Sequence, residues 1–197
     1  MTTSPKPMRM RPDDRRAEIL DAARRLLLES GYASVGLAEI AAAGEVSRPS
    51  VYRYFPDGRT DVFVAVVEAL GEELRDRLRY AGQVPFSPAR RLEQVLAALF
   101  AFFDETPEAY RLLFRDVWAV GDAGAEQASQ AVRALLAAEL AALLVDGGVA
   151  DADDVTVASN AILGAALATI ELTVAGVVDA ERAWRLTSDL AAAALPA

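Results

Sequence analysis

Apolar residues recur at helical spacing along almost the whole chain. Between residues 13 and 31, one helical face carries Ile19, Ala22, Ala23, Leu26 and Leu27. The same spacing predicts a short helix over 37–43 and a second one after Ser47, ending before the turn-forming Pro56-Asp57-Gly58. Because no segment alternates convincingly with period two, we expect an all-α fold with essentially no sheet.

Longer helices are predicted after this region. Helix starts are marked by Thr60, Ser87-Pro88 and Thr106-Pro107, because hydroxyl side chains cap helices and proline is tolerated in the first turn. Breaks are expected at 81–86 and 121–124. The last three helices are predicted over 125–145, 153–175 and 179–194.

Three parts are expected along the chain. These are a flexible basic arm at 1–12, a helix-turn-helix unit at 13–59 and a larger helical domain at 60–197. Residues 1–60 carry 10 basic and 8 acidic residues, a net charge of +2, whereas residues 61–197 carry 10 and 21, a net charge of −11. Phosphate contacts are local, so a chain of net charge −9 can still bind DNA through one basic face.

Composition narrows the chemistry. The 197 residues contain no Cys and no His, which excludes a disulfide framework, a thiolate nucleophile, a histidine base and an imidazole metal ligand in this chain. The only lysine, Lys6, lies in the predicted arm. We therefore expect no enzyme activity, no catalytic residues, no metal and no cofactor. The absence of cysteine suits a reducing cytoplasm.

No membrane span is expected. Residues 1–16 lack the apolar region of a secretory signal. The longest uncharged stretch, 155–170, is followed by Glu171 and falls short of the about 20 residues that a span needs. A buried bundle helix in a cytoplasmic protein fits this stretch better.

Candidate function lies in residues 43–55, which read AGEVSRPSVYRYF. The second helix of a helix-turn-helix exposes polar groups at its start, where Arg48 and Ser50 fall. Arginine can donate two hydrogen bonds to a guanine edge, and serine is adaptable. Charge and hydroxyl groups that can hold phosphates are offered by Tyr52, Arg53 and Tyr54. Taken singly, each of these residues could equally be an ordinary packing or solvated side chain.

The order of these residues closely resembles the TetR family of bacterial transcription regulators. The shared pattern covers roughly residues 14–63 and includes Gly31-Tyr32, Ile40-Ala41, Val46-Ser47 and Tyr52-Arg53-Tyr54-Phe55. The resemblance implies that Arg48 and Ser50 lie on a recognition helix. It also implies that Ser47, Tyr52 and Tyr54 contact phosphates or the helix start.

Three positions depart from the family pattern. Gly44-Glu45 stands where Ala-Gly is usual, and glutamate tolerates positive φ poorly, so we expect the left-handed residue at Gly44. Gly36 replaces the usual capping hydroxyl. The usual lysine after the recognition helix is absent, and its phosphate role is assigned to Arg59, one position later.

An effector pocket is predicted in the larger domain. Aromatic side chains on neighbouring helices can line an apolar cavity, and the resemblance implies that some of them face a ligand. A plain hydrophobic core is the alternative for each. Glu171 could bind the ligand, pair with an arginine or lie on a wet face. The candidates are Phe102, Phe103, Tyr110, Leu113, Phe114, Trp118 and Glu171.

Dimerisation is implied by the same resemblance, because the family pairs through its last two helices. Small residues over 158–168 would let two helices approach closely. Packing within one chain is the alternative for each candidate. The interface candidates are Ala165, Leu172, Trp184 and Leu190.

Together these features predict a homodimeric, ligand-responsive transcription regulator, with repression favoured. It would bind a palindromic operator in double-stranded DNA and be released by a small, partly apolar effector. The alternatives are a small-molecule carrier or a protein–protein interaction module that no longer binds DNA. DNA binding that depends on Arg48 separates the regulator from both.

Overall fold

The protein is described by a computed structural model that covers residues 12–120 and 122–195. Residues 1–11 of the predicted basic arm, and Gly121 in the predicted break, lie outside the described residues. The described part is helical and contains no strand, as expected. In chain order the helices are α1 (Pro12–Ser34), α2 (Leu37–Ala43), α3 (Arg48–Tyr54), α4 (Arg59–Gly82), α5 (Pro88–Glu105), α6 (Pro107–Tyr110), the π-helix η1 (Arg111–Arg115), α7 (Asp116–Val120), α8 (Ala123–Asp146), α9 (Ala152–Val174) and α10 (Ala180–Ala192).

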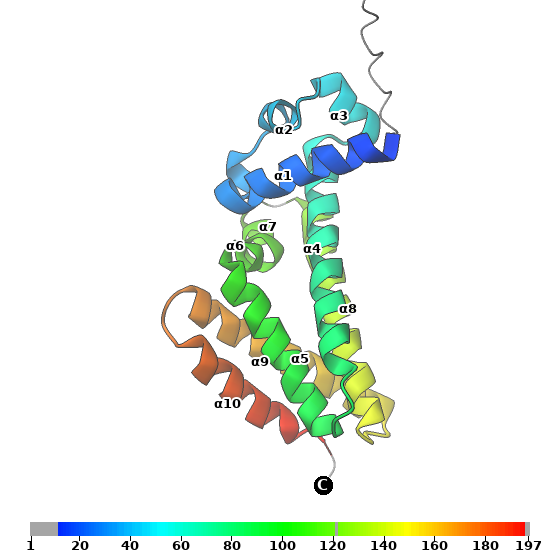
Figure 1. Cartoon of the computed structure of the whole chain (residues 1–197), viewed down its shortest axis with the longest axis vertical. Helices are drawn as coiled ribbons and strands as arrows, with labels where there is room; N and C mark the ends of the chain where they lie inside the picture. The colour runs from blue at the N-terminus through cyan, green and yellow to red at the C-terminus, as the bar shows by residue number, and fades with distance from the viewer. Residues whose placement is uncertain (1–11, 121, 196–197) are drawn as a thin grey trace, which may run out of the picture.

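Helices α1, α2 and α3 form the N-terminal end of the molecule, at the top of Figure 1. Ile19, Ile40, Val51 and Phe55 are buried between them, as the helical spacing predicts. The α1 helix is kinked at Gly31, which has φ 73°, a conformation that glycine adopts without a steric penalty. The helix predicted over residues 13–31 is therefore kinked at Gly31 and continues to Ser34.

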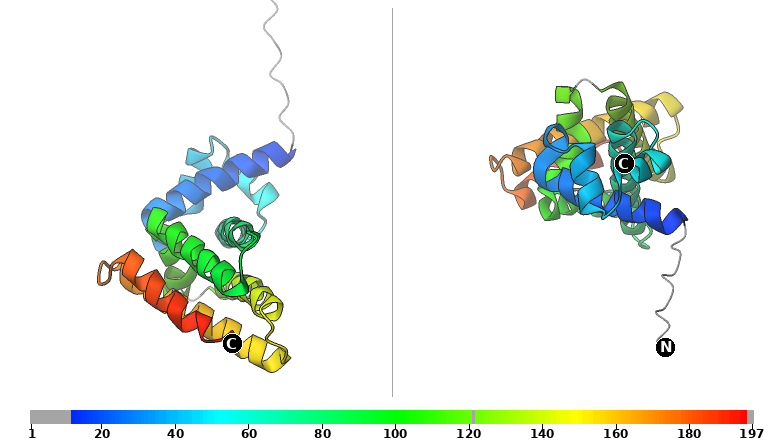
Figure 2. Two further views of the ribbon diagram at one scale, coloured as in Figure 1. Left: turned by 60° about the horizontal axis from the view of Figure 1, so that its bottom comes forward. Right: turned by 90° about the horizontal axis from the view of Figure 1, so that it is seen from above.

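The larger bundle lies below, and α4 runs along its length (Figure 1). Figure 2 shows that α5, α9 and α10 pack together on one side of α4. Close contact between α4 and α8 is made at Gly71, where an added Cβ would lie 2.5 Å from Val132 Cγ2. Since α4 also packs on α1, one continuous helix joins the two ends of the molecule.

Several predicted helix ends differ from the structure. Helix α4 begins at Arg59 with Gly58 as its N-cap, so the prediction that Thr60 caps it was wrong. The predicted loop at 81–86 begins two residues later, because α4 continues to Gly82. The predicted break at 121–124 is shorter, since Asp122 already caps α8. Thr106 does occupy an N-cap position, but its hydroxyl makes no capping hydrogen bond.

Within the described residues, two helices are long and apolar enough to cross a membrane by length and composition alone. They are α8 and α9, with mean hydropathy of 1.5 and 1.6 over their most apolar windows. The uncharged stretch at 155–170 belongs to α9. Both pack on each other within the bundle, which is the arrangement expected of core helices in a globular protein.

Candidate nucleic-acid interface and effector region

The turn between α2 and α3 places its left-handed residue at Glu45, which has φ 51°, whereas Gly44 has φ −87°. The prediction of a left-handed Gly44 was therefore wrong. The hydrogen bonds give the reason: Val46 N donates to Ala41 O at 2.9 Å and Glu45 N donates to Ala42 O at 3.2 Å. This pair requires positive φ at the residue that follows the C-cap, whatever its side chain.

The start of α2 also compensates for its glycine. The Glu39 carboxylate accepts a hydrogen bond from Gly36 N at 3.2 Å, which supplies one half of a capping box. The altered sequence around α2 therefore leaves both its start and its turn with regular geometry.

Helix α3 begins at a true cap. The Ser47 hydroxyl accepts from Ser50 N at 3.3 Å and donates to the Ser50 hydroxyl at 3.1 Å. Pro49 lies in the first turn, where no intrahelical partner is lost. Ser47 and Ser50 are thus bonded to each other at the helix start, while Arg48 next to them is exposed.

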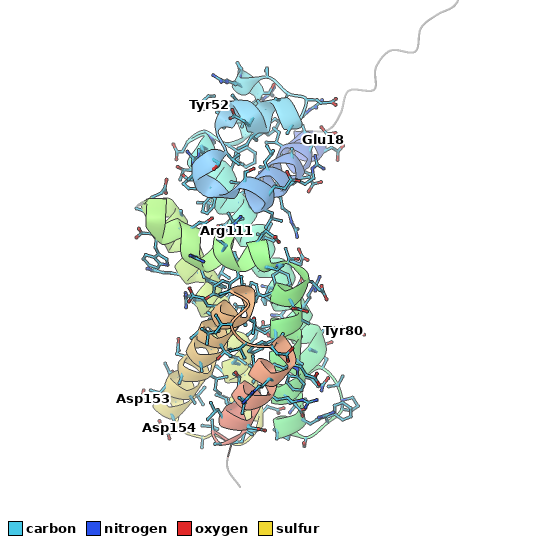
Figure 3. All side chains as sticks on the ribbon, turned by 90° about the vertical axis from the view of Figure 1, so that its left-hand side faces the viewer. Glu18, Tyr52, Tyr80, Arg111, Asp153 and Asp154 are labelled. Carbon is cyan, nitrogen blue, oxygen red and sulfur yellow. The ribbon has the colours of Figure 1, made fainter. Side chains whose placement is uncertain are left out.

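One face of α3 points outward and the other inward. Val51 is fully buried, whereas Arg48 and Arg53 are exposed and Tyr52 is 53% exposed. Figure 3 shows Tyr52 at the end of the molecule that carries α3. Tyr54 is half-buried and packs against the core, so less of it is available to a phosphate. Two cations and one phenol therefore share the outer face of a short, capped helix.

Arg59 does not extend outward as a phosphate contact would. Its guanidinium lies 3.9 Å from the centre of the Tyr32 ring and donates to Tyr32 O. The side chain is half-buried at the start of α4. In this conformation Arg59 joins α4 to the end of α1, and its phosphate contact stays a prediction.

A polar joint connects the three N-terminal helices to the bundle, and sequence reasoning missed it. Asp122 caps α8 by accepting from Ala125 N at 3.0 Å. Its other oxygen accepts from the Thr60 hydroxyl at 2.9 Å and from the Tyr32 hydroxyl at 3.2 Å. The hydrogen bond from Ala125 N is the main reason that the pKa of Asp122 is lowered. Burial raises the pKa of Tyr32.

Arg111 makes a second connection beside this joint, in the π-helix η1 that follows α6. It donates to Leu28 O at 3.2 Å and lies 3.3 Å from the Asp116 carboxylate (Figure 3). An added Cβ at Gly31 would lie 3.1 Å from the same carboxylate. Side-chain bonds therefore join α1 to the bundle from η1 as well as from α8.

Four of the predicted pocket aromatics pack on one another. The centre of the Phe103 ring lies 5.1 Å from the ring centre of Phe102, 5.5 Å from that of Tyr110 and 6.1 Å from that of Phe114. All three pairs are edge-on. Leu113 is fully buried beside them, and the Tyr110 hydroxyl donates to Leu167 O at 3.1 Å. In this conformation these side chains form a packed core, which is the alternative that the sequence left open.

The other two predicted pocket residues are exposed. Trp118 is 49% exposed and Glu171 lies on the surface of α9. Glu171 and Tyr110 do line one cavity of about 300 Å³, beside η1, and burial followed by the nearby Glu171 charge raises the pKa of Tyr110. The residues lining this cavity are Pro107, Glu108, Tyr110, Arg111, Arg115, Glu171, Val174 and Ala175.

Three of the four predicted dimer residues are exposed. Ala165 is exposed, Leu172 is 44% exposed and Leu190 is 71% exposed, whereas Trp184 is half-buried. An added Cβ at Gly164 would meet nothing within 4 Å. An apolar, small-residue face of α9 and α10 is thus left open in the single chain.

Comparison with known proteins agrees with this geometry. Residues 19–66 match the family described as bacterial regulatory proteins, tetR family. The chain is 30% identical over 108 residues to the HTH-type transcriptional activator FasR of Mycolicibacterium smegmatis, covering 55% of this chain and 49% of that protein. It is 34% identical over 82 residues to the HTH-type transcriptional regulator AcrR of Shigella flexneri, covering 41% and 38%. These matches span about half the length of the curated relatives or less.

Solved structures extend the likeness to the larger bundle. A TetR-like transcriptional regulator from Rhodococcus sp. RHA1 aligns with 93% of this chain and 96% of its own, with TM-score 0.69 and 25% identity. A tetR-family transcriptional regulator from Streptomyces coelicolor aligns with 93% and 84%, with TM-score 0.74 and 25% identity. Residues 19–66 thus match the tetR family, and the described chain as a whole shares its fold with TetR-like regulators.

Proposed function

We propose that the protein is a homodimeric transcription regulator that binds double-stranded DNA through α3. The observation that carries this proposal is the exposed side of α3, a capped helix with Arg48 at its start and Tyr52 and Arg53 in its last turn. Arg48 would read a guanine edge in the major groove, and Tyr52 and Arg53 would hold phosphates. The regular hydrogen bonds of the turn at Glu45 support an active helix-turn-helix.

Dimerisation through α9 and α10 would set the operator symmetry. The open face around Ala165, Leu172 and Leu190 supports this part of the proposal, because large exposed apolar side chains on one surface favour burial against a partner. A two-fold axis relates the two α3 helices, so the operator would be a palindrome with half-sites one helical turn, or a multiple, apart. Binding to chromosomal DNA would place the protein in the cytoplasm.

An effector in the larger domain would act through α4. This helix packs in the bundle and also begins at the polar joint, where Arg59 and Thr60 contact Tyr32 and Asp122. A ligand that favours one setting of α4 would change the spacing of the two α3 helices by its differential affinity for the two states. We propose a repressor that its effector releases from DNA. The alternative outcome is an activator, which is what the relative FasR is named.

The proposal is tested by selection from random duplex DNA with purified protein at moderate salt. The wild-type protein is expected to enrich one palindrome, and Arg48→Ala is expected to lose or relax it. Arg90→Ala is the matched control, because Arg90 is an exposed arginine of the larger bundle that pairs only with Glu93 among the described residues. Failure of a folded wild-type dimer to enrich any sequence would contradict the proposal.

A further inference from the structure

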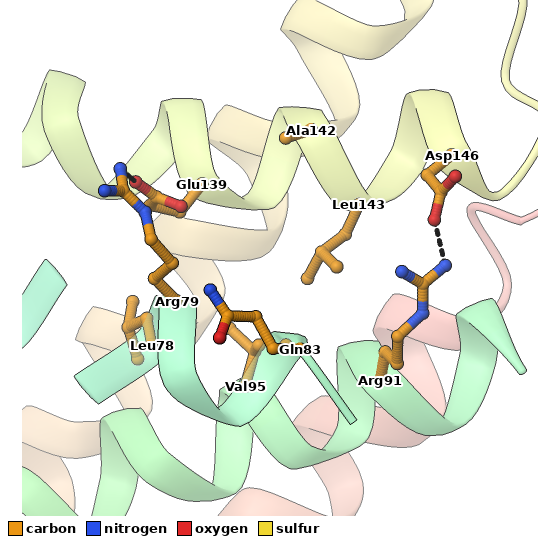
Figure 4. Close-up of a pocket in the computed structure, with 10 residues that line it drawn as sticks. Leu78, Arg79, Gln83, Arg91, Val95, Glu139, Ala142, Leu143 and Asp146 are labelled. Atoms are coloured by element: carbon orange, nitrogen blue, oxygen red, sulfur yellow. Dashed lines mark hydrogen bonds and ion pairs between the residues drawn. The ribbon is translucent and has the colours of Figure 1, made fainter. Parts of the chain in front are cut away.

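A groove at the far end of α4 combines an apolar floor with arginines. It has a volume of about 270 Å³ and lies between the end of α4, the start of α5 and the end of α8 (Figure 4). This volume equals that of about nine liquid waters, which is room for a short carbon chain. Its lining residues are Leu78, Arg79, Gly82, Gln83, Arg91, Val95, Glu139, Ala142, Leu143 and Asp146.

The floor of the groove is apolar because α4 ends in a glycine. An added Cβ at Gly82 would lie 3.3 Å from Val95 Cγ2 and 3.5 Å from Leu143 Cδ2, so any larger side chain would enter the space between them. Leu78 is buried beside these residues. The groove therefore offers an apolar molecule hydrophobic contact on the sides formed by three helices.

Two ion pairs flank this floor. Arg79 lies 2.6 Å from Glu139, and Arg91 pairs with Asp146 (Figure 4). The pairing with Glu139 raises the pKa of Arg79. Both pairs have one member that is half or more exposed, so each contributes little to stability and leaves its guanidinium available to a competing acceptor.

Arg91 has an unused donor. Its Nε is buried and has no hydrogen-bond partner among the described residues, although the guanidinium carries five donors. A buried donor without an acceptor is unfavourable, and a carboxylate is the acceptor whose two oxygens match the guanidinium fork. A ligand carboxylate would satisfy this donor when the Arg91 side chain turns its Nε, which is shielded from solvent here, toward the groove.

From the groove and this donor we propose that the protein binds a small amphipathic carboxylate here. The carboxylate would be bound by Arg91, and the apolar body would lie against Leu78, Val95 and Leu143. The proposal that a ligand binds in this groove rests on the geometry of the groove and does not depend on the proposed function. The further statement that the ligand is an effector rests on the proposed function, because α4 carries the groove at one end and the polar joint at the other.

The test uses octanoate as the probe and isothermal titration calorimetry of the full chain. Octanoate is expected to bind the wild-type protein saturably. The affinity of the wild type for the neutral analogue 1-octanol, and the affinity of Arg91→Gln for octanoate, are each expected to be about tenfold or more lower, which is the loss expected for charge-assisted hydrogen bonds. Arg77→Gln is the control, since Arg77 is an ion-paired arginine on the neighbouring helix α4 that does not line the groove.

A second pair of variants tests the space without changing charge. Ala142→Leu would narrow the groove from α8 and is expected to weaken octanoate binding about as much as Arg91→Gln does. Ala134→Leu changes an exposed site outside the groove and should leave octanoate binding unchanged. Equal affinity for octanoate and 1-octanol, unchanged affinity in Arg91→Gln, or no saturable binding would overturn the site.

Separate experiments test the ligand site and the proposed function. DNA selection without octanoate tests the regulator, and calorimetry without DNA tests the groove. Where both succeed, octanoate is expected to change the affinity for the selected duplex in the wild type but not in Arg91→Gln. Unchanged DNA affinity at saturating octanoate would overturn the effector role while leaving the binding site intact.

Discussion

Replacing Asp122 by alanine should destabilise the protein more than removing an ordinary helix cap. The carboxylate caps α8 and also accepts hydrogen bonds from Thr60 on α4 and Tyr32 at the end of α1. Asp122→Ala removes all three interactions at once and leaves the two hydroxyls of a partly buried joint without their acceptor.

The expected cost follows from the contacts. Loss of the cap is worth about 1 kcal/mol. Each hydrogen bond to a charged acceptor adds about 1.5 kcal/mol, which we reduce to about 1 kcal/mol because Asp122 is partly exposed. Asp122→Ala should therefore lower the free energy of unfolding by about 3 kcal/mol. The control Asp151→Ala, which removes the cap of α9 alone, should lower it by about 1 kcal/mol.

Urea unfolding of the four proteins in a double-mutant cycle measures the coupling across the joint. Tyr32→Phe keeps the ring that packs on Phe63 and Arg59 but removes the hydroxyl. Combined with Asp122→Asn, it should show a coupling free energy of about 0.5 to 1 kcal/mol. The reasoning is refuted if Asp122→Ala costs no more than Asp151→Ala, or if the two changes at Tyr32 and Asp122 are additive.

Three further predictions concern single sites. Because the pKa of Asp122 is lowered in the folded state, its contribution to stability is present above the unfolded-state pKa and is lost as the pH falls through the folded one. Urea midpoints should thus fall on acidification below about pH 4 more steeply in the wild type than in Asp122→Asn. Glu45→Gly should raise the free energy of unfolding by about 1 kcal/mol, since it relieves positive φ in a side-chain-bearing residue, and an unchanged urea midpoint would contradict this. Leu190→Glu should convert the proposed dimer to monomer in sedimentation velocity while circular dichroism stays helical, and a dimer that persists in the variant would contradict the placement of Leu190 in the interface.

The helices themselves could be predicted from the sequence because spacing and caps are local signals. The apolar positions of α1 and α4 recur at helical intervals, and Ser47 and Pro49 mark the start of α3. The turn could not be predicted correctly from residue preference. Positive φ at Glu45 is set by two backbone hydrogen bonds, which override the preference of glycine at the neighbouring position.

The exposed residues of α3 were predictable for the same reason, since Arg53 falls opposite the buried Val51 and Arg48 is the first residue of the helix. The contacts of Asp122 and Arg59 are tertiary and could not be predicted from local sequence. Asp122 could have been recognised as a helix cap, but its two partners lie 62 and 90 residues away in sequence. Arg59 turned inward because Tyr32 offers both a ring face and a carbonyl, a pairing across 27 residues that no local pattern reports.

We propose that Arg48 on α3 reads the DNA sequence. The most direct test of this proposal is fluorescence anisotropy with the selected duplex and its single-base variants, using wild type and Arg48→Ala at one salt concentration. The account predicts that Arg48→Ala loses about 1 to 3 kcal/mol of discrimination at one base pair in each half-site and keeps it elsewhere. Discrimination that is unchanged at every position in Arg48→Ala would contradict it.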